Sequence, residues 1–193
     1  LSKNLIVLPL ILALAGCSSI TSVNTHVTTG SQNQTCPGDT QLPTVLAGQF
    51  DAIEDADLLA RSIGEPSKGK LCQGQVYQAK TDSLISIYRA WNSTNPGSEK
   101  GQWWAAEMAQ GNTASYRKDY EICYQWSPLD KMTKCTLKAG SKVVIGTGQS
   151  AVCSEYLTYP TSAAKQIYIE GAASLTMDCS SYNDTFNWIP ATE

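Results

Sequence analysis

Arg89 is the residue whose type and position most directly suggest binding chemistry. The chain has only three arginines, and Arg89 lies in the apolar stretch 84–91, which predicts a β-strand. Alternation along that strand places Arg89 on the same face as Ile85 and Ile87. A guanidinium among apolar side chains needs a partner, because an unpaired buried charge costs several kcal/mol. That partner is either an internal carboxylate or a ligand anion such as a phosphate, which arginine binds through paired hydrogen bonds.

Three other segments with aromatic and polar side chains follow this strand along the chain. Adjacent tryptophans on a strand cannot both face inward, so one of the Trp pair is either core or an exposed binding surface. The arginine in the second segment lies on a helix surface or near a cleft, and the glutamine in the third is either an edge-strand residue or a site residue. The three segments are Gly101-Gln102-Trp103-Trp104, Tyr116-Arg117-Lys118-Asp119-Tyr120 and Gln166-Ile167-Tyr168-Ile169.

Together with Tyr88-Arg89-Ala90-Trp91, these segments resemble, in order and spacing, the ADP-ribosyltransferase fold and especially its NAD-cleaving toxin domains. Those domains begin with Tyr-Arg-Val-Trp, continue with Gly-x-x-Trp, and have a catalytic Gln or Glu at the start of a late strand. The likeness covers residues 76–169, about half of the chain. It implies a mainly antiparallel split sheet and NAD as substrate, with no metal.

The resemblance also implies roles for individual residues. Arg89 and Gln166 would be catalytic, Arg89 by holding the diphosphate and Gln166 by a hydrogen bond to the ribose. Tyr88, Trp103, Trp104 and Arg117 would complete the NAD-binding surface. Nicotinamide leaves as a neutral group from an oxocarbenium-like transition state, so the reaction needs no acid, only binding, stacking and polar stabilisation.

One triplet departs from the family pattern. Arginine-modifying members carry Glu-x-Glu where this chain has Ala164-Lys165-Gln166. A neutral amide cannot deprotonate an acceptor, so hydrolysis of NAD, or transfer to an already nucleophilic acceptor protein, is favoured. Glu155 and Glu170 are reserve carboxylates. The segment 146–150 is either a plain strand-end turn or one that brings Gln149 and Ser150 to the pocket mouth.

The elements that must position these residues read as an α+β domain with a mainly antiparallel sheet. Apolar residues at helical spacing predict an N-terminal helix over residues 52–63, which Gly64-Glu65-Pro66 ends. Gly, Pro, Asn and Ser separate short strand-like stretches, and the segment 138–141 resembles a hairpin turn. These stretches are residues 70–79, 84–91, 132–137, 142–146, 165–169 and 173–179.

The N-terminus predicts export and lipid attachment. Residues 5–16 form an apolar run that is too short for a membrane span of about 20 residues, as in a signal peptide. The run ends in Leu14-Ala15-Gly16-Cys17, which resembles the lipobox of bacterial lipoproteins, so we expect cleavage after residue 16 and acylation of Cys17. No Asp follows that cysteine, which favours the outer membrane. We expect residues 17–48 to be a polar tether and 49–193 a single domain.

Six cysteines follow Cys17, and an even number in an exported chain predicts three disulfides, with fifteen possible pairings. Their spacing does not suggest a metal site, and the single histidine, His26, falls in the tether. A Ser-His-Asp or Cys-His mechanism is therefore excluded for the predicted domain. The six are Cys36, Cys72, Cys123, Cys135, Cys153 and Cys179.

The formal net charge of −3 gives no electrostatic reason to expect a nucleic-acid partner. Two functions compete. The first is an NAD glycohydrolase or mono-ADP-ribosyltransferase that a lipid anchors to the membrane. The second is a non-enzymatic outer-membrane lipoprotein that uses its many tyrosines and tryptophans to bind an envelope or host partner.

Overall fold

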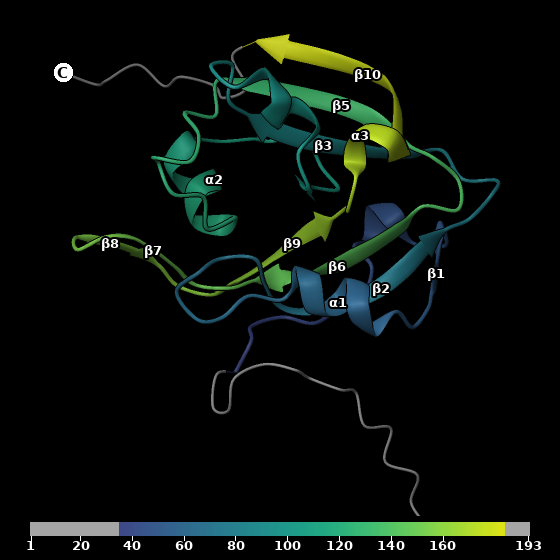
Figure 1. The fold of residues 1–193 in the computed structure, drawn as a ribbon, viewed down its shortest axis with the longest axis horizontal. Helices are drawn as coiled ribbons and strands as arrows, with labels where there is room; N and C mark the ends of the chain where they lie inside the picture. Colours follow the sequence, from purple (N-terminus) through teal and green to yellow (C-terminus); the bar gives the residue numbers. More distant parts are fainter. Residues whose placement is uncertain (1–34, 184–193) are drawn as a thin grey trace, which may run out of the picture.

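The computed structural model describes residues 35–183, and these residues form two antiparallel sheets that enclose a common apolar core. The larger sheet has the order β1-β2-β6-β9-β4 and the smaller sheet the order β10-β5-β3. Figure 1 shows the smaller sheet above the larger one, with the α2 helix at one side. The α+β class and the mainly antiparallel pairing are confirmed. The expected signal peptide and Cys17 lie outside the described residues.

The larger sheet forms from segments whose apolar side chains face the core. Its central ladder joins β2 to β6 and β6 to β9, and the β1 strand is added at one edge and the short β4 strand at the other. The core side chains Val143, Ile145 and Ile167 of this sheet are fully buried. The strands are β1 (Phe50–Ala52), β2 (Leu71–Ala79), β6 (Lys142–Gly148), β9 (Ser162–Tyr168) and β4 (Trp103–Trp104).

The smaller sheet places the Arg89 strand at an edge. It consists of β3 (Ile85–Trp91), β5 (Lys131–Leu137) and β10 (Thr176–Asn183). Ile85 and Ile87 face the core, as the alternation predicted. The backbones of Tyr88 and Ala105 exchange hydrogen bonds of 2.9 and 2.8 Å, which join β3 to the chain just beyond β4. The two sheets therefore approach each other beside Arg89.

The N-terminal helix is shorter than predicted. The α1 helix covers Ala56–Ser62, and Asp55 caps it by accepting a hydrogen bond of 3.0 Å from the Leu58 amide. Residues that the helical spacing had assigned to its first turn instead pair with β2, where Ala52 lies opposite Tyr77. Pairing with a distant strand has overridden a local helical pattern.

Four further helices complete the connections. The 3₁₀ helices are η1 (Thr44–Leu46) and η2 (Pro96–Lys100), and the α2 helix (Thr113–Asp119) begins at the side-chain cap Asn112. The α3 helix (Ala172–Leu175) occupies residues that were expected to begin a strand. It follows Gly171, which has a φ of 69° and turns the chain out of the sheet. Only the second half of the predicted strand 173–179 is extended.

The predicted hairpin at residues 138–141 is wrong. Gly140 does adopt a positive φ of 74°, and the Ser141 amide donates to the Lys138 carbonyl. However, β5 and β6 belong to different sheets, so this turn carries the chain from one sheet to the other. The sequence analysis also missed a hairpin, β7 (Ala151–Ser154) with β8 (Leu157–Tyr159), which projects from the body in Figure 1.

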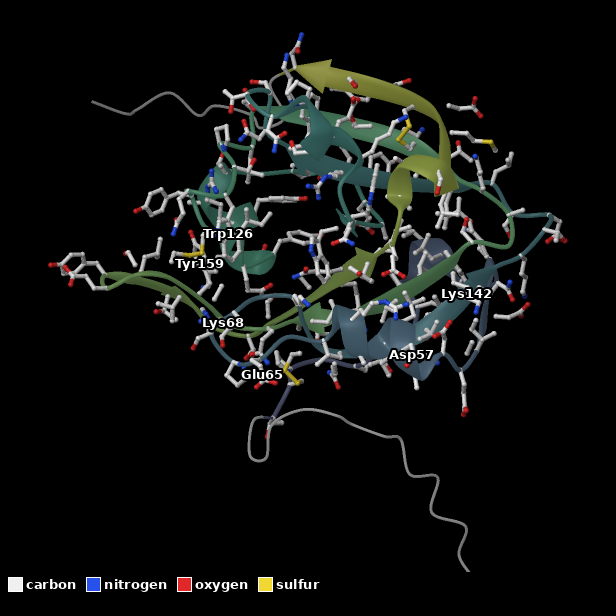
Figure 2. The ribbon with its side chains drawn as sticks, in the orientation of Figure 1. Asp57, Glu65, Lys68, Trp126, Lys142 and Tyr159 are labelled. Carbon is white, nitrogen blue, oxygen red and sulfur yellow. A yellow bond between two sulfur atoms is a disulfide. The ribbon has the colours of Figure 1, made fainter. Side chains whose placement is uncertain are left out.

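Three disulfides staple the fold, as predicted. They are Cys36–Cys72, Cys123–Cys153 and Cys135–Cys179. The first ties the beginning of the described chain to β2, the second ties the segment after α2 to the β7–β8 hairpin, and the third joins β5 to β10. The yellow sulfur bonds are visible in Figure 2.

The folded part also begins earlier than the predicted boundary at residue 49. Leu46 is buried in the main core, the Tyr77 hydroxyl donates to the Thr40 carbonyl at 2.8 Å, and Lys165 pairs with Asp39. The segment 35–48 is therefore part of the domain. Within residues 35–183, no helix is long and apolar enough to cross a membrane.

Candidate functional site

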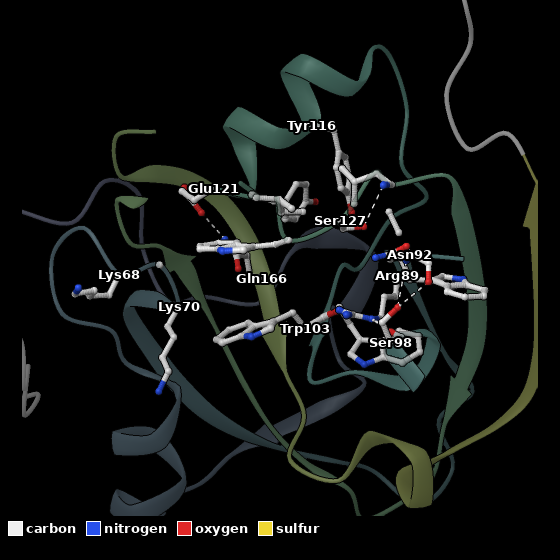
Figure 3. Close-up of a pocket in the computed structure, with 18 residues that line it drawn as sticks. Lys68, Lys70, Arg89, Asn92, Ser98, Trp103, Tyr116, Glu121, Ser127 and Gln166 are labelled. Carbon is white, nitrogen blue, oxygen red and sulfur yellow. Dashed lines mark hydrogen bonds between the residues drawn. The ribbon is translucent and has the colours of Figure 1, made fainter. Parts of the chain in front are cut away.

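A pocket of about 340 Å³ opens where the two sheets meet the α2 helix and the segment that follows it. Its wall combines basic, aromatic and carboxyl–amide side chains that come from separate parts of the chain (Figure 3). Three of the predicted binding residues, Arg89, Trp103 and Gln166, lie in that wall together with Trp104. The side chains used below are Lys68, Lys70, Arg89, Trp103, Trp104, Glu121, Trp126 and Gln166.

Arg89 has internal partners, and they are backbone carbonyls. Its Nε donates to the Ser98 carbonyl and its Nη1 to the Trp103 carbonyl, each at 2.6 Å. Burial lowers the pKa of the guanidinium to about 10, so Arg89 remains a cation at neutral pH. Nη2 has no hydrogen-bond partner among the described residues. Gly101 makes room for this arrangement, because a Cβ at that position would lie 2.5 Å from Nη2.

The two adjacent tryptophans face different surroundings, as alternation requires. Trp104 is part of the main core, and its indole nitrogen donates to the Gly101 carbonyl at 2.7 Å. Trp103 is only partly buried, and its ring lies 5.0 Å from that of Tyr168, centroid to centroid. Trp103 is therefore the better placed of the two to offer a ring face to a ligand.

A buried carboxyl–amide pair lies in the same wall. Gln166 Nε2 donates to Glu121 Oε2 at 2.6 Å, and the Glu121 side chain is 2% exposed. Burial raises the pKa of the Glu121 carboxyl to about 8, although the hydrogen bond from Gln166 acts in the opposite direction. Its other oxygen, Oε1, is buried and has no hydrogen-bond partner within residues 35–183.

Two backbone features hold Glu121 in this position. It follows the α2 helix with a φ of 48°, a conformation that a residue other than glycine adopts at a cost. Its carboxyl packs directly on Gly148 at the end of β6, where a Cβ would lie only 1.9 Å from Oε2. A glycine on one strand and a strained backbone on another segment thus make space for one carboxyl group.

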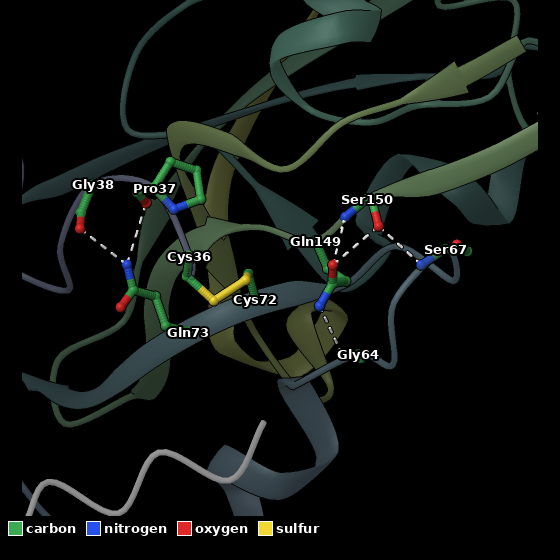
Figure 4. Close-up of a disulfide and its surroundings, with 9 residues drawn as sticks. All are labelled: Cys36, Pro37, Gly38, Gly64, Ser67, Cys72, Gln73, Gln149 and Ser150. Carbon is green, nitrogen blue, oxygen red and sulfur yellow. Dashed lines mark hydrogen bonds between the residues drawn. A yellow bond between two sulfur atoms is a disulfide. The ribbon is translucent and has the colours of Figure 1, made fainter. Parts of the chain in front are cut away.

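Two exposed lysines, Lys68 and Lys70, lie at one edge of the pocket, as Figure 3 shows. They belong to the loop between α1 and β2, which the segment after β6 holds in place. Gln149 donates to the Gly64 carbonyl at 3.2 Å, and the Ser67 amide donates to Ser150 Oγ at 2.9 Å (Figure 4). Gln149 and Ser150 therefore support the mouth of the pocket and do not line it.

Two other predicted binding residues, Tyr88 and Arg117, are outside the pocket wall. Tyr88 packs beside the cluster under α2 and lies under the Lys134 ammonium, 6.0 Å from its ring centre. Arg117 donates to the carbonyls of Ile122 and Ser127, the second at 2.6 Å, and so braces a segment that does line the pocket. Neither side chain lines the pocket in this structure, and the contacts described for each are with the protein itself.

The reserve carboxylates are also elsewhere. Glu170 forms an exposed ion pair with Arg61, and Glu155 lies in the turn of the β7–β8 hairpin. Glu121, Lys68, Lys70 and Trp126 were not singled out from the sequence. The only available signal was for Glu121, a carboxylate between two large apolar residues and close to a cysteine expected to form a disulfide.

Within residues 35–183, no group of three or more His, Cys, Asp or Glu side chains could hold a metal ion. The arrangement instead offers cations for an anionic group, ring faces for a planar group, and one carboxyl and one amide for hydrogen bonds. Comparisons of the chain with models of known protein families, with curated proteins and with solved structures give no match.

Proposed function

We propose that this domain binds NAD⁺ in the pocket and cleaves its nicotinamide–ribose bond, as an NAD glycohydrolase with a fold of the ADP-ribosyltransferase type. The observation that carries the proposal is the meeting of Arg89, Trp103 and Gln166 in one wall. They come from β3, β4 and β9, three strands that are distant in sequence. A ligand with an anionic diphosphate, a planar ring and a ribose fits this combination of groups.

The positions of the charged and aromatic side chains support a separate binding place for each part of the ligand. Lys68 at the edge attracts the diphosphate, and the charged guanidinium of Arg89 in the pocket wall adds to that attraction. Trp103 stacks on a planar ring. The Oε1 of Gln166 has no hydrogen-bond partner among the described residues, so it can accept from a ribose hydroxyl while Nε2 holds Glu121.

Hydrolysis is favoured over transfer to a protein. Departure of neutral nicotinamide needs no proton donor, and the ribosyl cation that forms reacts readily with water. Transfer to a weak nucleophile needs a base beside it. Glu121 is the only carboxyl in the described pocket wall, and its raised pKa keeps it largely protonated at neutral pH. A mono-ADP-ribosyltransferase would need an acceptor that is already nucleophilic.

We also propose that the chain is exported and held on the outer membrane through lipid on Cys17. The three disulfides support the export step, since such bonds persist in oxidising compartments. Replacement of Cys17 by Ser should abolish labelling by radioactive palmitate and release the protein from the membrane fraction. Unchanged labelling would contradict the proposal.

Binding without cleavage is a second candidate, and exposed aromatic side chains favour it. Trp126, Tyr124 and Tyr156 are all exposed, the last at 90%, and Trp126 also lines the pocket. Figure 2 shows Trp126 close to the β7–β8 hairpin. Exposed aromatic side chains are enriched where proteins bind other molecules.

One experiment separates the two candidates. The soluble chain that begins at Ser18 is titrated with NAD⁺ in a calorimeter, and nicotinamide release is followed by chromatography. We expect binding and release, and Gln166→Ala should lower turnover more than affinity. Lys68→Ala should weaken binding a few-fold, and Lys142→Ala, a surface lysine paired with Asp55, should not. Binding without release favours the second candidate, and absence of both rejects NAD⁺ as ligand.

A further inference from the structure

The edge of the pocket that is open to solvent, its mouth, includes an exposed tryptophan that the core does not need. Trp126 lines the pocket, and it is 53% exposed. It belongs to none of the four apolar clusters of the described residues. Because burial of an indole is favourable, an exposed tryptophan in a pocket wall is a candidate for contact with a ligand.

The backbone around Trp126 is held on both sides. The Trp126 amide donates to the Cys123 carbonyl at 3.0 Å, and the Cys123–Cys153 disulfide ties this turn to the β7–β8 hairpin. On the other side, Arg117 Nη2 donates to the Ser127 carbonyl at 2.6 Å. A ring on a backbone that is already fixed loses little conformational freedom on binding, which favours affinity.

The ring of Trp126 lies beside Gly69, in the loop between α1 and β2. A Cβ at Gly69 would lie 3.5 Å from Cη2 and 3.8 Å from Cζ3 of Trp126, so this contact involves the outer edge of the indole. The Gly69 amide donates to the carbonyl of Ser150, which directly precedes β7. The loop and the Trp126 segment are therefore both attached to the chain at β7, and this attachment fixes their relative positions.

Lys68, next to Gly69, adds an unpaired positive charge at the mouth. Lys68 is exposed and lines the pocket, and its ammonium has no hydrogen-bond or ion-pair partner within residues 35–183. Lys70 differs, because its ammonium donates to the Arg61 carbonyl at 3.0 Å. A lysine ammonium binds phosphate as a point charge, and at Lys68 a phosphate would displace no internal partner.

We propose that Trp126 and Lys68 form a subsite at the mouth for a neutral aromatic base that carries a phosphate, as in an adenosine phosphate. The indole stacks on the base, and the ammonium pairs with the phosphate. The nicotinamide ring of NAD⁺ is a cation, so the charge of Lys68 disfavours it here, whereas adenine is neutral. The inference deepens, and rests on, the proposed function, because NAD⁺ would place its adenosine half in this subsite.

Calorimetry of the soluble chain with AMP, adenosine and nicotinamide mononucleotide tests the subsite. The wild type should bind AMP more tightly than adenosine, which lacks the phosphate. Trp126→Ala should weaken AMP binding about tenfold, since a stacking ring is removed, and Trp126→Phe should keep most of the affinity. Lys68→Ala should weaken AMP binding a few-fold and leave adenosine binding unchanged. Nicotinamide mononucleotide should bind more weakly than AMP, and Trp126→Ala should not change its affinity.

Tyr124→Ala is the matched control, because Tyr124 is 58% exposed in the same segment but does not line the pocket. It should keep the wild-type affinity for AMP. Thermal melts establish that each variant is folded, and Trp126→Leu, which removes the ring but keeps an apolar side chain, replaces Trp126→Ala if that variant is unstable.

Three results would overturn the proposal. They are a wild type that does not bind AMP, equal AMP affinities of the wild type and the variant without the Trp126 ring, and equal losses at Tyr124 and Trp126. A loss at Trp126 that is larger for nicotinamide mononucleotide than for AMP would overturn the assignment of the neutral base.

The outcomes also separate this proposal from the one on which it rests. NAD⁺ that is bound and cleaved equally by the wild type and by Trp126→Ala leaves the proposed function standing and refutes the subsite. AMP bound through Trp126 and Lys68, without cleavage of NAD⁺, supports the subsite and refutes the proposed cleavage. A wild type that binds neither AMP nor NAD⁺ refutes both.

Discussion

The pocket contains two buried ionisable groups that the fold treats in opposite ways. At Arg89, the guanidinium donates hydrogen bonds of 2.6 Å to two backbone carbonyl oxygens and keeps its charge. At Glu121, the Gln166 amide donates to Oε2, and Oε1 has no hydrogen-bond partner among the described residues. Burial raises the pKa of the carboxyl to about 8, so the group is mainly neutral at pH 7. The residue that was expected to bind a ligand is thus largely occupied by the protein. The residue with unused hydrogen-bonding capacity was not anticipated.

The two groups also differ in where their partners come from. Ser98 and Trp103 are 9 and 14 residues from Arg89, so the Arg89 corner forms from one stretch of chain. Gln166 is 45 residues from Glu121, and Gly148 belongs to yet another strand. The Arg89 corner is local architecture, whereas the Glu121 corner exists only when the larger sheet is complete. The following substitutions test this difference.

Arg89→Met should have the largest effect on stability. It removes two hydrogen bonds from a charged donor and leaves two carbonyl oxygens without a hydrogen-bond donor. We expect a loss of about 3 kcal/mol or more in the free energy of unfolding. Arg89→Lys should fall between the wild type and Arg89→Met, because an ammonium cannot reach both carbonyls in the same geometry. Chemical denaturation measures each value.

Arg61→Met is the control for Arg89. Arg61 pairs with Glu170 on the surface, and such pairs contribute about 1 kcal/mol or less. Equal losses for the two variants, or a loss at Arg89 confined to ligand affinity, would show that Arg89 acts mainly on the ligand.

Gly148→Ala should have an intermediate effect, because its Cβ would lie 1.9 Å from Oε2 of Glu121. Overpacking of this kind costs about 1–3 kcal/mol. If the clash is with the carboxyl, the double variant Gly148→Ala/Glu121→Ala should lose much less than the two single losses combined. Gly97→Ala, whose Cβ would have only an ordinary contact at 3.5 Å, is the control. Additive losses in the free energy of unfolding would mean that Gly148 is needed for the β6 strand itself and not for the placement of Glu121.

The smallest expected effect is a pH slope. The folded-state pKa of Glu121, about 8, is above the ordinary value of 4.5, so the folded state holds a proton that the unfolded state has lost. Wild-type stability should therefore fall as the pH rises from 6 to 8, by about 1.4 kcal/mol per pH unit at most. Glu121→Gln should remove this slope, as measured by denaturation at several pH values.

The pH slope can be assigned to Glu121 because few other described groups interfere. The four other carboxyls with a shifted pKa, Asp39, Asp55, Glu99 and Asp130, are all shifted downward, and residues 35–183 contain no histidine. A Glu121→Gln variant with the wild-type slope would show that Glu121 is ionised in the folded state, contrary to the comparison with Arg89.

Much of the sheet could be predicted from local patterns. The stretches 70–79, 84–91 and 132–137 agree with β2, β3 and β5 within one residue at each end. These strands could be predicted because the alternation of apolar side chains lies within each strand's own sequence. The β1 strand could not be predicted in this way, since its helical spacing yields to pairing with β2. The β7–β8 hairpin was missed because its short strands contain few core residues.

The same distinction between local and distant patterns applies to the residues of the candidate site. Arg89, Trp103 and Gln166 were predicted because each belongs to a segment with a recognisable pattern, and the pocket does contain them. Glu121 was not, since its burial depends on Gly148 and Gln166, residues that no local pattern connects to it. The roles expected of Tyr88 and Arg117 depended on direction in space, which segment order does not specify.

The Cys36–Cys72 bond has a mechanical consequence. It closes a covalent loop between residues 36 and 72, and it delivers the preceding chain to the start of β2, a strand hydrogen-bonded on both sides. Tension applied to the chain before Cys36 would therefore pass through the disulfide, shown in Figure 4, into β2 of the larger sheet. The α1 helix and the Lys68–Lys70 edge of the pocket lie inside the closed loop and would carry none of that load.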